Sequence, residues 1–236
     1  MPTNSPCGGS PRVPRKTLRR WGHAATKRAG LEARAEGPGR RSHPPHGTGG
    51  CFLSYIVWYA SAMASLEQAR ALIRDVPDFP QPGILFKDLT PILGEPAAFH
   101  AVIDELAGRV RGRGFQRIVA IESRGFLFGA ALADRLGLGL APVRKLGKLP
   151  YKTDRVEYAL EYGTGTLEAH VDAVRPGEKV VIVDDLLATG GTAAAARRLV
   201  EKQQGTVGSF LFVVELRGLR GREKLQGTEV EALIVF

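Results

Sequence analysis

Two adjacent carboxylates, Asp184 and Asp185, follow the apolar run 180–183 and precede the segment Ala188-Thr189-Gly190-Gly191-Thr192. The apolar run is typical of a buried parallel strand, and the alanine-rich stretch 192–203 predicts a helix. Backbone N–H groups at the start of that helix, together with the two threonine hydroxyls, are suited to bind a phosphate. The carboxylates are suited to accept hydrogen bonds from vicinal sugar hydroxyls, and they would repel a polyphosphate. The pattern therefore favours a sugar-phosphate site over a tight structural turn.

A second anion site is predicted where Glu122-Ser123-Arg124-Gly125 follows the apolar strand 117–121. Arg124 carries a fork of donors, and the amides of Ser123 and Gly125 lie near the start of a predicted helix. Three further cations, Arg144, Lys145 and Lys148, follow another short strand. Each cluster alone is typical of a solvated surface. Together with the first site they fit a ligand with a phosphate at one end and a diphosphate at the other.

The elements that must position these residues alternate between helix and strand, which predicts an α/β fold with a mainly parallel sheet. In such folds ligands gather at the carboxyl ends of the strands. Residues 76–88 hold three prolines and a glycine and are expected to form a stiff, extended loop with exposed aromatic side chains. The helices are expected at 65–75, from Pro96, at 125–136 and at 192–203, and the strands at 117–121, 140–143, 155–162 with 167–171 as an antiparallel hairpin, 179–183, 207–216 and 230–236.

The net charge of +9 belongs almost entirely to residues 1–62. This leader holds ten of the 33 lysines and arginines, two of the 24 acids, and both cysteines, among many glycines and prolines. The remainder, 63–236, is nearly neutral and has no cysteine, so thiol chemistry and cysteine-type zinc sites are not expected there. Three interpretations of the leader stay open: a targeting segment, a basic nucleic-acid arm, or an upstream frame before a true start at Met63.

Five further segments accompany the acid pair, and with them residues 63–236 resemble the type I phosphoribosyltransferase family, in particular its adenine-specific members. The leader shows no such resemblance. The resemblance implies a twisted, mainly parallel sheet flanked by helices, with a small hood segment and a flexible hairpin loop over the site. The matching segments are 79–88, Glu122 to Gly129, Arg144-Lys145 with 147–150, Leu160 to Gly163, Asp184 to Thr192, and 221–225.

The family's donor substrate is 5-phosphoribosyl 1-diphosphate, which carries Mg²⁺ rather than leaving it to dedicated protein ligands. The resemblance implies that Asp184 and Asp185 hold the ribose hydroxyls near that Mg²⁺. It implies that the segment Ala188, Thr189, Gly190, Gly191 and Thr192 holds the 5-phosphate. Ser123 and Arg124 would meet the diphosphate, with Arg144, Lys145 and Lys148 adding charge from a mobile loop. A cis peptide is implied between Glu122 and Ser123.

The acceptor implied by the resemblance is adenine, with AMP and diphosphate as products. Glu161 would act as the acid or base at adenine N7, with Tyr162 beside it, although the alternation of its strand also fits a solvated residue. Leu85 would pack against the purine opposite Leu186, and backbone groups near Lys87 would read its edge. The implied protein is a cytoplasmic homodimer, with no nucleic-acid or membrane partner. Another purine as acceptor, or a non-catalytic regulator on the same fold, remain the alternatives.

Overall fold

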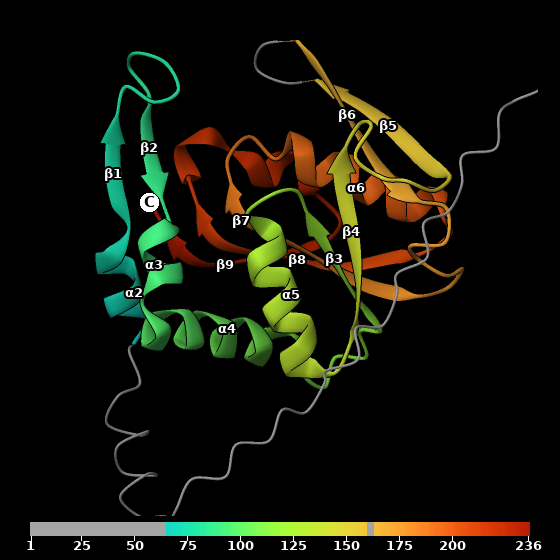
Figure 1. Cartoon of the computed structure of the whole chain (residues 1–236), viewed down its shortest axis with the longest axis horizontal. Helices are drawn as coiled ribbons and strands as arrows, with labels where there is room; N and C mark the ends of the chain where they lie inside the picture. The colour runs from blue at the N-terminus through green and yellow to red at the C-terminus, as the bar shows by residue number, and fades with distance from the viewer. Residues whose placement is uncertain (1–64, 160–162) are drawn as a thin grey trace, which may run out of the picture. The chain divides into compact units, whose positions relative to one another are not determined.

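Seven strands form the central sheet within residues 65–159 and 163–236, the part of the chain that this computed structural model describes. Their order across the sheet is β5-β6-β4-β3-β7-β8-β9 (Figure 1). The parallel strands are β3 (Arg117–Ile121), β4 (Gly139–Lys145), β7 (Lys179–Leu187), β8 (Thr206–Glu215) and β9 (Glu229–Val235). The antiparallel hairpin of β5 (Thr153–Ala159) and β6 (Thr164–His170) attaches to the end of β4. The predicted α/β class with a mainly parallel sheet is confirmed.

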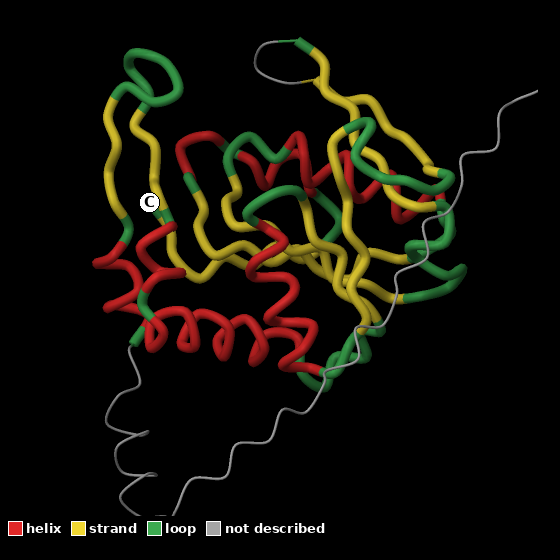
Figure 2. The backbone as a smooth tube through the Cα atoms, viewed as in Figure 1, coloured by secondary structure: helices red, strands yellow, loops and turns green. Residues whose placement is uncertain are grey.

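Helices cover both faces of the sheet, so that the strands form the middle layer (Figure 2). Strand β7 shows why both faces must be covered. Val181 and Val183 pack into the core beneath α4 and α5, whereas Val180 and Ile182 pack into the core beneath α6, and all four are fully buried. Burial of each such side chain stabilises the fold by about 1.5–3 kcal/mol. The helices are α2 (Leu66–Leu72), α3 (Thr90–Gly94), α4 (Pro96–Val110), α5 (Gly125–Leu136) and α6 (Gly191–Lys202), with short 3₁₀ turns η1 (Arg217–Leu219) and η2 (Gly221–Leu225).

Strand β3 lies where the winding of the chain reverses direction. After β3 the chain passes through α5 to β4 on one side, and it later returns to place β7 on the other side of β3. Such a switch point leaves a crevice outside the carboxyl ends of the two strands, where ligands of open α/β sheets bind. The residues that follow β3 and those that end β7 are therefore brought together by topology alone.

The segment expected to be an irregular loop instead contains a two-stranded antiparallel ribbon, and that expectation was wrong in this respect. Strand β1 (Arg74–Pro77) pairs with β2 (Leu85–Asp88), and the helix expected to reach residue 75 ends at Leu72. The prolines do not prevent this pairing, because Pro77 occupies the last position of β1 and the others lie in the connecting turn. The ribbon is called the hood below, and its exposed Phe79 agrees with the expectation of exposed aromatic side chains.

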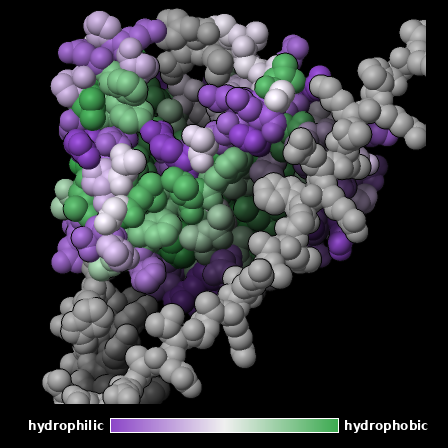
Figure 3. Space-filling view, viewed as in Figure 1, coloured by the Kyte–Doolittle hydropathy of each residue, from purple (hydrophilic) through white to green (hydrophobic). Residues whose placement is uncertain are grey.

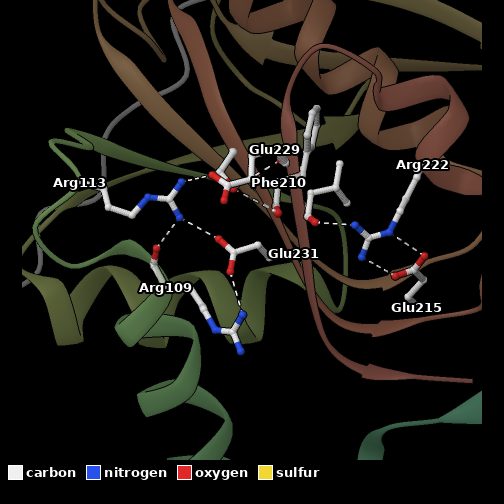
Figure 4. Close-up of polar contacts among 9 residues, drawn as sticks. Arg109, Arg113, Phe210, Glu215, Arg222, Glu229 and Glu231 are labelled. Atoms are coloured by element: carbon white, nitrogen blue, oxygen red, sulfur yellow. Dashed lines mark hydrogen bonds and ion pairs between the residues drawn. The ribbon is translucent and has the colours of Figure 1, made fainter.

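Ion pairs fasten the last strand and the η2 turn to the rest of the domain (Figure 4). Arg113 bonds to both Glu229 and Glu231 of β9, and Arg109 reaches Glu231 at 3.0 Å, so helix α4 is tied to the edge strand. Arg222 makes a two-pronged contact with Glu215, at 2.8 and 2.6 Å, and also donates to the carbonyl oxygen of Val230. Glu215 is 3 % exposed, so this second pair holds η2 firmly against β8 and β9.

The remaining elements follow the expected pattern closely. Ser65 caps α2 with a reciprocal bond to Gln68, and α5 ends at Gly137, which has a left-handed φ of +65°. Strand β7 runs beyond the expected end at Val183, so the acid pair lies within the strand. No helix among residues 65–159 and 163–236 is long and apolar enough to cross a membrane. The expected leader, 1–62, lies outside the described residues.

Candidate active site

The carboxyl ends of β3 and β7 border a cavity of about 430 Å³. A smaller hollow of about 80 Å³ adjoins it at Thr192 and is formed by the turn from β7 into α6. The two hollows bring eleven of the predicted site residues into one place, while Glu122, Tyr158 and Leu167 line the larger one without having been predicted. Predicted residues in the larger cavity are Ser123, Arg124, Lys145, Asp184, Asp185, Leu186 and Thr192, and those in the smaller include Ala188, Thr189, Gly190 and Gly191.

The acid pair lies on the floor of the larger cavity. Asp184 accepts a hydrogen bond from the backbone N–H of Asp185 at 2.9 Å. Removal of water from Asp184 by the surrounding protein, and then the nearby charge of Asp185, raise the pKa of the Asp184 carboxyl well above its ordinary value of 3.8. Gly125 makes room for this arrangement, because a Cβ atom there would lie 2.6 Å from Asp184 Oδ1. The pair is thus a crowded acceptor site that hydroxyl donors or a cation would relieve.

Arg124 is the cation closest to the acid pair. Its Nε lies 2.5 Å from Asp185 Oδ2, and its guanidinium lies 5.0 Å from the centre of the Phe86 ring in the hood. Asp185 is 5 % exposed, and its Oδ2 is enclosed beside this guanidinium without a further hydrogen-bond partner. The peptide bond between Glu122 and Ser123 is cis, as the resemblance implied.

The smaller hollow is a cradle of backbone amides at the start of α6. Gly190 precedes the helix with a left-handed φ of +75°, and no capping side chain occupies the N–H groups of its first turn. Gly221 of η2 packs directly behind this turn: a Cβ on Gly190 would overlap the Gly221 carbonyl oxygen, and a Cβ on Gly221 would overlap that of Ala188. The 12-residue helix directs its positive end into the hollow, as an anion site requires. Gly221 belongs to the segment 221–225 that carries the family resemblance, but no role in the site was predicted for it.

The three cations at the end of β4 are not equivalent. Lys145 lines the cavity, and its backbone N–H donates to Glu122 at 3.0 Å. Arg144 is engaged by both oxygens of Glu122, at 3.2 and 3.3 Å, and it donates to the carbonyl oxygen of Lys148. Lys148 is exposed and contributes to the electrostatic field at Glu122. The geometry therefore places Lys145 at the cavity, while the guanidinium of Arg144 supports the loop.

Phe86 is the hood residue that lies beside Arg124. Leu85 is 50 % exposed, and alternation along β2 places it on the face opposite to Phe86. Phe86 faces Arg124, whereas the Lys87 side chain pairs with Asp75 at 2.6 Å and lies over the Phe236 ring. Leu186 lines both hollows, as expected for the opposite wall. The alternation of side chains along residues 85–88 could have identified Phe86 as a residue on the opposite face of the strand from Leu85.

Glu161 and Tyr162 lie outside the described residues, but the strand that leads to them is well anchored. Arg198 of α6 donates to the carbonyl oxygen of Glu157 at 2.6 Å, and Lys202 pairs with Asp154 at 3.0 Å. The helix that begins at the cradle therefore also holds β5 along its length.

The carboxylates of the acid pair are the candidate ligands for a divalent cation at the cavity. Among the described residues no group of three or more histidine, cysteine or acidic side chains could hold a metal by itself. The two adjoining carboxylates of Asp184 and Asp185, which line the cavity, nevertheless suit Mg²⁺, which is commonly held by one or two carboxylates together with water and substrate phosphates. The residues thus fit a cation that arrives with an anionic substrate.

A mainly parallel sheet with helices on both faces, an acid pair near the carboxyl end of a central strand, and an amide cradle at the following helix are the features of a phosphoribosyltransferase. The sequence pattern of the phosphoribosyl transferase domain family matches residues 92–232. The chain belongs to the adenine phosphoribosyltransferase family, and it is an enzyme of that class. Adenine phosphoribosyltransferases that are 51–58 % identical to the chain over 65–73 % of its length carry this assignment.

Curated relatives and solved structures agree on the family. The adenine phosphoribosyltransferases of Thermoanaerobacter sp. strain X514 and Sorangium cellulosum are each 56 % identical over 172 residues, which is 73 % of this chain and 99 % and 86 % of theirs. The crystal structure of the Thermoanaerobacter pseudethanolicus enzyme is 55 % identical, with a TM-score of 0.72 over 73 % of this chain and all of its own. The Saccharomyces cerevisiae enzyme, solved with an imino-altritol bisphosphate and adenine, is 41 % identical, with a TM-score of 0.68 over 74 % and 99 %.

Proposed function

We propose that the chain transfers the phosphoribosyl group of 5-phosphoribosyl 1-diphosphate to N9 of adenine, giving AMP and diphosphate. The observation that carries this proposal is the joining of the amide cradle and the acid pair with Arg124 and Lys145 around two adjoining hollows. The cradle has the geometry for a 5-phosphate, the acid pair for ribose hydroxyls, and the cations for a diphosphate. The spacing therefore fits one ligand that carries all three groups.

In the proposed reaction the bond between ribose C1 and the diphosphate oxygen breaks, and its electron pair leaves with the diphosphate. A bond forms between C1 and adenine N9, which loses its proton. Arg124 and Lys145, with Ser123 and the loop of Arg144 and Lys148, stabilise negative charge on the departing diphosphate. Mg²⁺ bound with the donor would neutralise part of the same charge. Asp184 and Asp185 orient the ribose ring and favour positive charge developing on it.

The base would lie between Leu186 and the hood, where backbone groups of Leu85 to Lys87 offer hydrogen bonds to the purine edge. Such a site distinguishes adenine from oxypurines because a mismatched base leaves buried polar groups unpaired. Glu161, with Tyr162 beside it, is proposed to donate a proton to N7, so that the N9 proton is lost more easily.

We extend the proposal to three further properties. The protein is cytoplasmic, it forms a homodimer, and its translation starts at Met63. An apolar patch lies over helix α5 in Figure 3, and Leu127 of that helix is 47 % exposed. A second copy of the chain is the occupant proposed for this face, and light scattering of the purified protein tests it. Mass spectrometry of the native N-terminus tests the start, since peptides from residues 1–62 would contradict it.

Steady-state assays with adenine, hypoxanthine, guanine and xanthine test the activity, each with the donor and Mg²⁺. AMP formation from adenine alone is expected. Turnover of another purine without adenine would contradict the base assignment. Salt-dependent binding to DNA without any AMP synthesis would instead support a regulator on the same fold.

A further inference from the structure

Glu168 on β6 is a buried carboxylate that the proposed reaction does not use. It is 1 % exposed, and its chain neighbours Leu167 and Ala169 belong to the apolar core beneath α6. A charge in such a place is strongly unfavourable unless hydrogen-bond donors surround it. The donors around Glu168 therefore indicate what the residue does.

Those donors come from the loop between β4 and β5 and from the start of β5. The backbone N–H groups of Lys148 and Leu149 both donate to Glu168 Oε1, at 3.0 and 3.1 Å. The Thr153 hydroxyl donates to Oε2 at 3.2 Å, and Arg155 Nε lies 3.5 Å from the same atom. Burial alone would raise the pKa of Glu168, but the amides of Leu149 and Lys148 and the Thr153 hydroxyl lower it below 4.5. The side chain is therefore ionised and its amide bonds are charge-assisted.

The loop is held at two places by two carboxylates. Glu122, directly before Ser123, fixes its beginning through the Lys145 N–H, and Glu168 fixes its far side through residues 148 and 149. Between them Gly147 turns the chain with a φ of +80°. Lys145 lines the cavity, and the charge of Lys148 acts on Glu122. Lys145 is the last residue of β4 and leads into this loop, whose shape decides where Lys148 lies.

We propose that Glu168 is a positioning residue of the diphosphate subsite, which holds the backbone of Lys148 and Leu149 so that Lys145 and Lys148 face the departing diphosphate. The inference rests on the proposed function. It predicts a defect mainly at the diphosphate end of the ligand. A smaller effect is expected on adenine binding, because the hood and Leu186 lie on other elements than this loop.

The test compares Glu168→Leu, Glu168→Gln and Glu178→Leu in the full chain. Glu178 is a matched control: it is also buried, at 7 % exposed, and it also pairs with an arginine, Arg117, but at the start of β3 rather than its end. Calorimetry measures binding of inorganic diphosphate with Mg²⁺, and kinetics give the KM of each substrate. Hydrogen exchange reports directly on the amides of Lys148 and Leu149.

Glu168→Leu is expected to weaken diphosphate binding by about tenfold or more, the equivalent of losing one charge-assisted bond, with the KM for adenine within about twofold of wild type. Glu168→Gln keeps an oxygen for both amides and should restore most of the affinity. Equal weakening in Glu178→Leu, or wild-type diphosphate affinity and amide exchange in Glu168→Leu, would overturn the role of Glu168. Wild-type protein that binds no diphosphate would overturn the proposed function itself.

Discussion

Arg124 and Asp185 form an ion pair, 2.5 Å from Nε to Oδ2, that joins the turn after β3 to the end of β7. The pair fixes the guanidinium beside the cavity while its outer nitrogens stay available to a ligand, since the Arg124 side chain is 35 % exposed. The same guanidinium lies near the Phe86 ring, so one side chain connects the hood, the acid pair and the expected diphosphate site.

Arg124→Lys should therefore weaken inorganic diphosphate binding by about 10- to 100-fold, because a lysine ammonium lacks the planar fork that can meet Asp185 and an anion together. Calorimetric titration with diphosphate and Mg²⁺ measures this. Arg135→Lys on the same helix is the matched control, since Arg135 pairs with Asp104 at the surface. Similar affinities in the two variants would contradict the assignment.

Asp184→Asn should stabilise the ligand-free protein at neutral pH by about 1–2 kcal/mol, because the amide removes an unfavourable buried charge. The raised pKa means that folded Asp184 binds its proton more tightly than the unfolded chain does. The wild-type free energy of unfolding should thus fall, relative to the variant, as the pH rises from about 3.8 through the raised pKa. Urea denaturation from pH 3.5 upward, in steps of about one unit, measures this window. If the difference in free energy of unfolding between wild type and Asp184→Asn does not vary with pH, the prediction is wrong. Asp134→Asn, on the surface of α5, is the control.

Gly221→Ala should disrupt the phosphate cradle although residue 221 lies outside it. The added methyl group would overlap the Ala188 carbonyl oxygen, and relief of that overlap must displace the cradle or the η2 turn. We expect about tenfold weaker binding of ribose 5-phosphate and a loss of about 1–3 kcal/mol in stability. Gly218→Ala, which meets nothing within 4 Å, should change neither, and equal effects of the two substitutions would refute the prediction.

Phe86→Ala should raise the KM for adenine by about tenfold or more, the usual worth of one aromatic stack on a base. Leu85→Ala should have a smaller effect, because Leu85 is half exposed on the other face of β2. Steady-state kinetics with varied adenine distinguish the two. A larger effect at Leu85 would restore the assignment that the sequence favoured.

Glu161→Gln should lower kcat by about 10²- to 10⁴-fold, the range for loss of a general acid or base, with little change in donor binding. Glu157→Gln, two alternations earlier in the same strand pattern, serves as the comparison. An unchanged kcat in Glu161→Gln would remove this residue from the mechanism.

The sequence was most informative where one local pattern dictates one structure. The apolar run 180–183 has no polar face to leave in water, so it is expected to form a buried strand, and the glycines and threonines after it are expected to turn into a helix. The site residues that came from this turn and from Glu122 to Gly125 meet at one cavity because adjacent parallel strands end at the same edge.

What the sequence could not supply is contact between distant segments. Nothing near Arg144 shows that Glu122 engages it, nothing near Gly221 shows that it packs behind Gly190, and Glu168 looks like any polar residue in a hairpin. The number of prolines in residues 76–88 predicts an irregular loop, and for the hood that prediction is wrong. The positions of the prolines, at a strand end and in a turn, decide whether pairing survives.

Helix α6 begins at the amide cradle and holds β5 through Arg198 and Lys202. An α-helix hardly stretches or bends over three turns, so the cradle and this strand move as one rigid body. The conformational entropy of bringing them into register is lost once, when the chain folds, and not again each time a ligand binds. Phosphate binding at one end of the helix therefore carries no additional entropy cost for ordering the strand along its side.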